Sequence, residues 1–161
     1  MAEPAGKAPQ KESSATPGLF VDPYRAYSFK LCVTDMIDAA FAQCCGLGRT
    51  VDTIDYCEGG SSKVYHVPGR TRCHPVTLYY GLTQSRQLWD WMDSISKGIT
   101  PVPRKNIHIL ILDADGMSEK VRWTLYNAWP CSWRGAKLDA LASEIAIESV
   151  EFVYENVDRQ P

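Results

Sequence analysis

The segment IHILILDADGMSEKVRWTLYNAW, residues 107–129, decides the fold class of this chain. Residues 107–112 are apolar at both odd and even positions, with His108 as the exception, so an extended strand here would be apolar on both faces. Such strands lie in the centre of a sheet with both faces covered. The run Asp113–Gly116 predicts a turn, and the alternation over 121–129 predicts a second strand. The segment therefore predicts a central β-hairpin.

Further strands are predicted on either side of this hairpin. Upstream, residues 27–33 and 76–80 alternate with a period of two. The segments 36–45 and 51–58 show weaker patterns, which strands covered on both faces would also give. Downstream, residues 138–145 fit a helix as well as a strand, and we favour one strand over about 144–155 with a bulge near Ser149. The chain is thus predicted to be mainly β, a two-sheet β-barrel or sandwich.

One helix is predicted over about residues 84–97, flanking the strands. Thr83 or Ser85 can cap its start, and Gly98 followed by Pro101 ends it. Four large side chains recur at the spacing i, i+3, i+4 and i+7, which places them on one stripe of a helix. This predicted buried stripe consists of Leu88, Trp91, Met92 and Ile95.

Composition divides the chain into a short arm and one domain. Residues 1–22 hold three prolines among small and charged residues, which predicts a flexible N-terminal arm. Residues 23–161 are long enough to form a single domain. Within it, residues 58–74 carry the Gly-Gly and Pro-Gly pairs typical of loops, together with apolar side chains. We therefore predict an extended loop that acts in assembly, through Gly59, Gly60, Ser61, Lys63, Val64, Tyr65 and Val67.

The charge balance argues against nucleic acid and membrane as main partners. Lys and Arg total 17 against 19 Asp and Glu, a formal net charge of −2 without a basic block. No apolar run approaches the roughly 20 residues that a membrane-spanning helix needs, so we expect no membrane insertion. The N-terminal region carries Glu3, Lys7, Lys11 and Glu12 where a secretory signal would be apolar, so we expect synthesis in the cytoplasm.

The sequence contains no arrangement typical of an enzyme or a metal site. None of the three histidines, His66, His74 and His108, accompanies a patterned nucleophile. Six cysteines in a reducing compartment predict free thiols. Zinc is the sharper alternative for Cys57 and Cys73 with the two nearby histidines, but the stretch has neither a Cys-x-x-Cys knuckle nor a zinc-type His pair. We therefore expect no catalysis, no metal and no cofactor.

Five tryptophans leave one alternative function open. An exposed row of indole rings stacks sugars, whereas tryptophans in a β-rich domain more often fill a core or a subunit interface. We favour packing, and the alternative is a carbohydrate- or ligand-binding β-sandwich module. The residues concerned are Trp89, Trp91, Trp123, Trp129 and Trp133.

A series of short motifs runs in order through residues 22–156. They read Asp22-Pro23-Tyr24-Arg25, Cys45-Gly46-Leu47, Tyr56-Cys57-Glu58-Gly59-Gly60, Val67-Pro68-Gly69-Arg70-Thr71, Val76-Thr77-Leu78 with Gly81-Leu82-Thr83, Leu88-Trp89-Asp90-Trp91, Asn127-Ala128-Trp129-Pro130 with Trp133, and Glu144-Ile145-Ala146-Ile147-Glu148. Together they resemble the tail tube proteins of contractile phage tails and contractile injection systems, relatives of the haemolysin-coregulated tube protein of type VI secretion. The chain departs from that pattern at Cys45 and Cys57, where the family prefers Ser and Arg.

The resemblance implies a structural inner tube subunit and no enzymatic activity. It implies a two-sheet β-barrel with one flanking helix, hexameric rings, and a hollow tube of stacked rings inside a contractile sheath. The implied partners are other copies of the chain, the sheath, the baseplate and spike proteins and a terminator or cap protein, with a cargo effector or DNA in the lumen. The implied location is the bacterial cytoplasm for assembly, and then a phage tail or an injection particle that is cytoplasmic, membrane-anchored or released.

Overall fold

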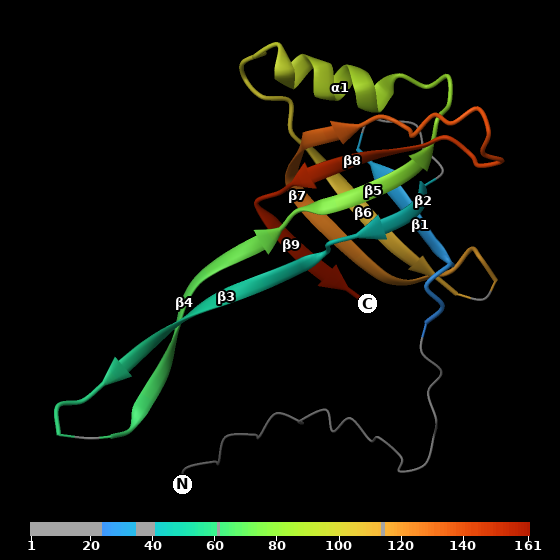
Figure 1. Ribbon diagram of the computed structural model, residues 1–161. Coiled ribbons are helices and arrows are strands. Elements are labelled where there is room, and N and C mark those ends of the chain that lie inside the picture. Colours follow the sequence, from blue (N-terminus) through green and yellow to red (C-terminus); the bar gives the residue numbers. More distant parts are fainter. Residues whose placement is uncertain (1–23, 35–40, 61, 114) are drawn as a thin grey trace, which may run out of the picture.

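The computed structural model describes residues 24–34, 41–60, 62–113 and 115–161, which form nine strands and one helix (Figure 1). Every strand pair among them is antiparallel. In chain order the elements are β1 (Phe29–Val33), β2 (Phe41–Cys45), β3 (Gly48–Cys57), β4 (Val64–His74), β5 (Val76–Gly81), α1 (Gln87–Ser96), β6 (Lys105–Leu112), β7 (Glu119–Arg134), β8 (Ile147–Val153) and β9 (Asn156–Gln160).

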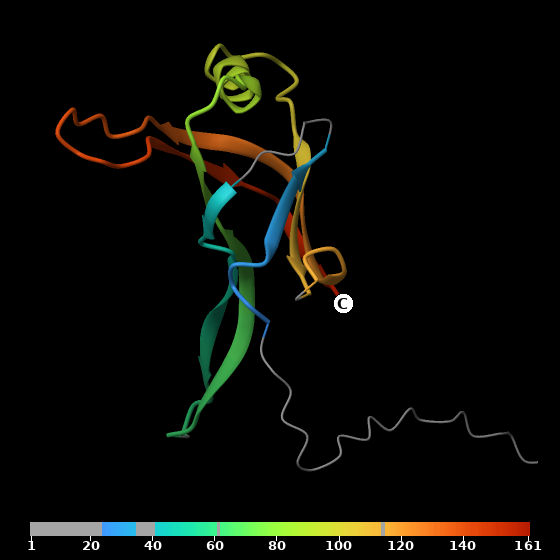
Figure 2. The ribbon, with the colours of Figure 1, turned by 90° about the vertical axis from the view of Figure 1, so that its right-hand side faces the viewer.

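Seven strands form a barrel of two layers that share β7 (Figures 1 and 2). One layer has the order β1-β6-β7-β9, and the other has the order β7-β8-β5-β2. The strand predicted to be central is β6, which pairs with β1 on one side and with β7 on the other. The predicted fold class, mainly β with two sheets and one flanking helix, is confirmed.

β7 serves both layers because its backbone turns at Asn127. This residue has a φ of 54°, in the left-handed region that asparagine tolerates better than most residues. Its backbone N–H donates to Asn106 Oδ1 (3.2 Å), and its side-chain Nδ2 donates to Glu155 Oε2 (2.7 Å). Residues up to Ala128 pair with β6 or β9, and residues from Trp129 onward pair with β8.

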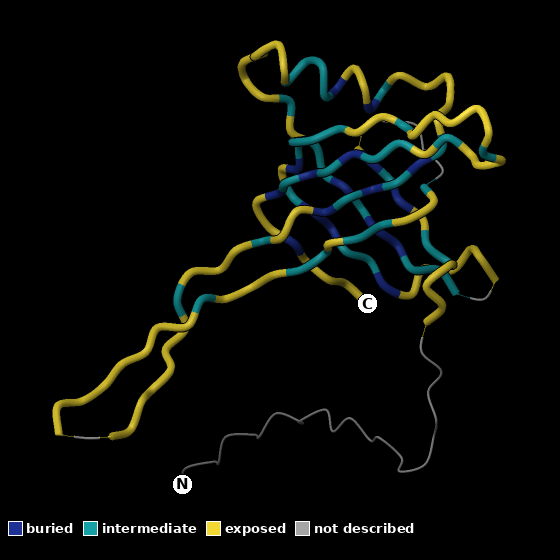
Figure 3. Tube along the Cα trace, viewed as in Figure 1, coloured by how far each residue is buried: buried dark blue, intermediate teal, exposed yellow. Residues whose placement is uncertain are grey.

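The core lies between the two layers (Figure 3). Full burial of a large apolar side chain contributes about 1.5–3 kcal/mol to the free energy of folding. The largest fully buried side chains are Ile107 and Leu125 in one layer and Val76, Leu78, Pro130, Val150 and Phe152 in the other.

Helix α1 covers one end of this barrel (Figure 2) and lies within the predicted range 84–97. Leu88 and Trp91 are its buried residues. The Trp91 ring lies 5.4 Å from the Phe152 ring between centroids, and its Nε1 donates to the Pro103 carbonyl (2.7 Å). Across the described ranges, no helix has both the length and the apolar character to cross a membrane.

The prediction of a loop over 58–74 is wrong. β4 occupies Val64–His74 and pairs with β3, so only residues 58–63 connect the two strands. Both strands are exposed to solvent on both faces for most of their length, and such strands give no alternation of apolar and polar residues. Pro68 and Gly69 lie inside β4 at a bulge, where glycine and proline are tolerated.

The predicted bulge near Ser149 is also wrong. β8 pairs with β5 over Ile147–Phe152 without a register shift. Val150 and Phe152 point into the core, whereas Ile145 and Ile147 are exposed. The two pairs of apolar residues therefore do not share one face of the strand, and no bulge is required to bring them onto it. Residues 135–146 form an irregular loop, and β9 is an additional strand. The predicted N-terminal arm (1–22) and part of the predicted strand 36–45 lie outside the described residues.

Candidate assembly surfaces

β3 and β4 extend away from the barrel as a two-stranded ribbon, called here the projecting hairpin (Figures 1 and 2). Its outer half is exposed on both faces (Figure 3). An isolated two-stranded ribbon is only marginally stable in water. The hairpin is therefore a candidate for contact with another molecule.

The strand register collects four apolar side chains on one face of its outer half. Ile54 lies opposite Val67, and Tyr56 lies opposite Tyr65. Residues directly opposite each other in an antiparallel pair point to the same face, and so do residues two apart in a strand. The two tyrosine rings are 6.5 Å apart, and all four side chains are between 40% and 56% exposed. We call Ile54, Tyr56, Tyr65 and Val67 the hairpin cluster.

Polar side chains surround this cluster. Asp55 Oδ1 and His66 Nδ1 are hydrogen-bonded on the opposite face (2.7 Å). Asp52 and Arg72 form an ion pair (2.9 Å) between the cluster and the barrel. Both pairs are largely exposed, where such interactions contribute about 0–1 kcal/mol. The outer half of the hairpin is therefore amphipathic, with one apolar face.

The predicted assembly residues occupy different parts of the hairpin. Gly59 and Gly60 form the connecting turn, where Gly60 has a φ of 85°. Tyr65 and Val67 belong to the hairpin cluster, and the Lys63 ammonium lies 4.9 Å from the centre of the Tyr65 ring. Val64 lies opposite Cys57 on the other face. Ser61 is outside the described residues.

Sequence reasoning missed Ile54 and Tyr56, which lie on β3. Their spacing of two residues is repeated by Tyr65 and Val67 beyond the turn. That symmetry about Gly59-Gly60 is typical of two paired strands and was the available signal.

The base of the hairpin is fixed to the barrel. Arg49 donates to the Val157 carbonyl (3.1 Å), and the Tyr154 hydroxyl donates to the Gly48 carbonyl (3.2 Å). Gly46 has a φ of 87°, and a Cβ placed on it would lie 2.4 Å from the Pro75 carbonyl oxygen. These contacts set the direction in which the hairpin leaves the barrel.

The predicted helix stripe faces the barrel to different degrees. Leu88 and Trp91 are 8% and 5% exposed. Ile95 is half-buried and packs against the core, and Met92 is also half-buried. This stripe holds α1 against the barrel.

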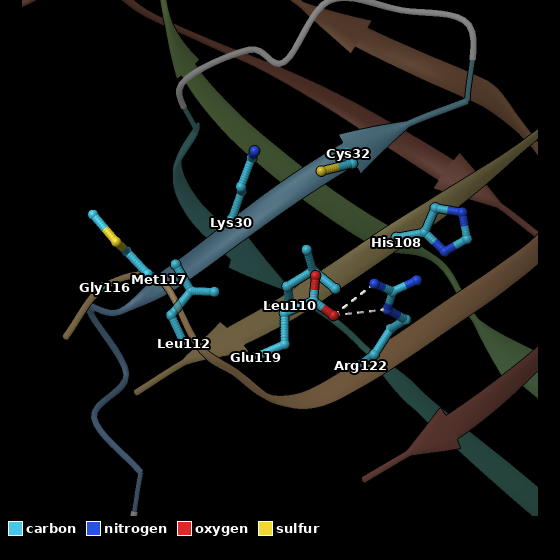
Figure 4. A pocket seen from close by; sticks show the side chains of 9 residues that line it. All are labelled: Lys30, Cys32, His108, Leu110, Leu112, Gly116, Met117, Glu119 and Arg122. Carbon is cyan, nitrogen blue, oxygen red and sulfur yellow. Dashed lines mark hydrogen bonds and ion pairs between the residues drawn. The ribbon is translucent and has the colours of Figure 1, made fainter. Parts of the chain in front are cut away.

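A cavity of about 380 Å³ lies on the outer side of β1, β6 and β7 (Figure 4). Cys32 and His108 are register partners and both line it. Burial, reinforced by the Arg122 guanidinium, lowers the pKa of His108, and its Nδ1 lies 3.1 Å from Thr124 Oγ1. The Glu119 carboxylate accepts from Arg122 (2.5 Å) and does not orient the imidazole. The geometry assigns no reaction to this cavity.

The four residues considered as zinc ligands lie apart along the projecting hairpin. Cys57 pairs with Val64 near the turn, whereas Cys73 pairs with Arg49 near the barrel, and strand geometry separates these positions by roughly 26 Å. His74 Nε2 lies 2.5 Å from Thr50 Oγ1, and His66 bonds to a carboxylate. One ion cannot bind all four residues.

Four of the five tryptophans are buried or half-buried, and Trp89 is 41% exposed. Trp91 is buried, and Trp123 and Trp129 pack against the core. Trp89 and Trp133 meet edge to face, with ring centroids 4.7 Å apart and an interplanar angle of 81°. Sugar stacking requires an open ring face, so these rings favour packing over a carbohydrate platform.

Comparison with known proteins gives a consistent result. The sequence model of the family described as T4-like virus tail tube protein gp19 matches residues 25–158. A chain of the anti-feeding prophage cap structure (AFP tube terminating cap) is 25% identical, with a TM-score of 0.82 over 92% of this chain and 98% of that chain. A chain of the PVC sheath-tube complex in the extended state, an extracellular contractile injection system, is 28% identical, with a TM-score of 0.78 over 86% and 91%.

Hcp1 from Flavobacterium johnsoniae shares the fold at 14% identity, with a TM-score of 0.53 over 81% of this chain and 93% of that chain. No curated protein matches this chain closely enough to count as a relative. The family match covers the barrel, α1 and the projecting hairpin together. The chain therefore belongs to the family of T4-like virus tail tube proteins.

Proposed function

We propose that this chain is the inner tube subunit of a contractile injection system or a contractile phage tail, in which hexameric rings stack into a hollow tube. The hairpin cluster is the observation that carries this proposal, because its four apolar side chains lie away from the barrel and remain between 40% and 56% exposed. Full burial contributes about 1.5–3 kcal/mol per large apolar side chain. Repeated around a ring, that contribution favours assembly over the free subunit.

The role is structural, and the partners follow from it. A sheath surrounds the tube, a baseplate starts it, and a cap ends it, as the names of the related structures suggest. A spike protein at the baseplate completes the set of partners. The lumen carries an effector protein or DNA. Assembly takes place in the bacterial cytoplasm before the particle is released, anchored or built into a phage.

The predicted assembly residues act through the projecting hairpin. Tyr65 and Val67 make the apolar contact together with Ile54 and Tyr56, while Gly59 and Gly60 allow the tight connection between the strands. Lys63 keeps a positive charge next to the contact.

Electron microscopy of the full-length protein, alone and with its baseplate, tests the proposal. We expect rings or tubes of uniform bore, and rings without tubes are expected where the baseplate is missing. A protein that stays monomeric with all components present would overturn the proposal.

A shortened-hairpin variant separates assembly from folding. Joining Val51 to Thr71 through Asn-Gly keeps their pairing and removes the outer half of the hairpin. The barrel should fold, since the removed part makes only exposed contacts, and tubes should be lost. Tubes of normal length from this variant would count against the role of the hairpin cluster.

A further inference from the structure

A second exposed apolar surface lies at the far end of strand β5. Leu138, Leu141 and Ile145 are 82%, 97% and 80% exposed, which is unusual for such large side chains in a soluble protein. Leu82 and Ile147 lie where the loop with these residues joins β8, because the Leu82 N–H donates to the Ala146 carbonyl (2.9 Å) and Gly81 pairs with Ile147. We call these five residues the end patch.

The loop that carries the end patch has a defined shape. The Leu141 N–H donates to Asp139 Oδ1 (3.0 Å), and the Ala142 N–H donates to the Asp139 carbonyl (3.2 Å). This turn leaves the Leu138 and Leu141 side chains in solvent. The patch is thus built into the fold at the start of β8.

The end patch and the hairpin cluster lie at opposite ends of the molecule. β4 leads through Pro75 directly into β5, so the projecting hairpin extends from the start of β5, and Leu82 follows its end. Figures 1 and 2 show the hairpin and the loop 135–146 on opposite sides of the barrel. The two surfaces therefore cannot meet within one chain.

Charge next to the two surfaces is complementary. The Lys63 ammonium lies over the Tyr65 ring in the hairpin cluster (4.9 Å). Beside the end patch, Lys137 and Asp139 lie within ion-pair distance of each other (4.0 Å). Glu144, next to Ile145, is exposed and takes part in none of the ion pairs found among the described residues, so the unpaired charge here is negative. An apolar contact flanked by opposite charges favours association of these two surfaces over contact of either surface with itself.

We propose that the end patch of one subunit receives the hairpin cluster of a second copy of the chain. This inference rests on the proposed function. When a hairpin on one copy binds a patch on the next, an open assembly keeps a free hairpin at one end and a free patch at the other. Further subunits can then be added, or the two free ends can join and close a ring. Hairpin-to-hairpin contact would instead stop at a pair.

Photo-crosslinking tests the contact directly. Tyr65 is replaced by p-benzoylphenylalanine in the full-length chain, assembled particles are irradiated, and the linked peptide is found by mass spectrometry. We expect links from residue 65 to residues 138–147 of another copy. Links from 65 to another projecting hairpin, or to a site away from the end patch, would overturn the proposal.

Substitution of the end patch gives a second test. The double variant Leu141→Asp with Ile145→Asp should lose at least about tenfold in tube mass while its circular dichroism stays unchanged, because both side chains are exposed. Met117→Asp is the control, since Met117 is 86% exposed and lies on neither surface. If the double variant forms tubes as well as the wild type does, the inference is overturned and the proposed function remains intact. Wild-type protein that stays monomeric with all components present would overturn both.

Discussion

Trp91 joins α1 to the barrel through both its ring and its nitrogen. The ring packs on Phe152, and Nε1 donates to the Pro103 carbonyl. Trp91→Ala removes the ring contact and leaves this carbonyl without its donor, so we expect a loss of about 3–5 kcal/mol in the free energy of unfolding. Urea denaturation of the unassembled chain measures this loss.

The neighbouring Asp90 provides the matched control for Trp91. Its carboxylate lies 3.5 Å from Arg86 on the exposed side of α1, where an ion pair contributes about 0–1 kcal/mol. Asp90→Ala should therefore change the stability by less than about 1 kcal/mol. Equal losses for the two variants would show that the helix packs through a different face.

Asp115 makes the turn between β6 and β7 sensitive to acid. Hydrogen bonds from the Ser118 hydroxyl, the Ser118 N–H and the Met117 N–H lower the pKa of Asp115 to about 2. Because this pKa is lower in the folded chain than the usual value of about 4, the stabilisation is present above pH 4 and is lost as the pH falls towards 2. The stability difference between wild type and Asp115→Asn should shrink over that range in urea denaturation. A difference that does not change with pH would refute this account.

At the scale of elements, burial explains which predictions hold. β6 and α1 each contact the core and could be predicted, β6 because it is apolar at nearly every position and α1 because its apolar residues recur with the helix period. The projecting hairpin has no buried side along its outer half, so the only signal for Ile54 and Tyr56 was the matching spacing of Tyr65 and Val67 across the turn. Pro68-Gly69 resembled a loop. Ile145 and Ile147 are exposed, whereas Val150 is buried. The sequence pattern alone does not distinguish an exposed apolar residue from a buried one.

Gly46 controls the junction where β2 leads into the projecting hairpin. Its φ of 87° and the approach of the Pro75 carbonyl leave no room for a side chain. Gly46→Ala should therefore cost at least about 1–3 kcal/mol from backbone strain, in addition to the steric clash. The control is Gly59→Ala, because a Cβ on Gly59 would meet no atom within 4 Å. Thermal unfolding compares them, and similar melting temperatures would show that the junction relaxes without cost.

At the scale of the whole molecule, two different apolar surfaces lie at opposite ends, and the sequence alone does not show this arrangement. Its motifs predicted the family and hence the barrel, but the positions of the hairpin cluster and the end patch depend on how β4 continues into β5 and how β8 begins. The strand register places one surface at each end of this path. Such a molecule can associate head to tail without limit, as a tube requires.

This polarity predicts how defective subunits act on normal ones. The shortened-hairpin variant retains an end patch, so it binds the hairpin of a wild-type subunit. It lacks the hairpin cluster, so no further subunit can bind to it at that end. Added to wild-type protein during assembly, it should shorten the tubes in proportion to its share. Leu141→Asp with Ile145→Asp should do the same from the other end, because it keeps the hairpin cluster and lacks a working patch.

A variant that combines both changes provides the decisive comparison. It has neither surface, so it cannot join a growing end, and wild-type tubes should keep their normal length in its presence. Tube lengths measured by electron microscopy at equal amounts of each variant give the test. If the combined variant inhibits as strongly as the single-surface variants, or if the latter leave tube length unchanged, growth does not depend on the pairing of these two surfaces.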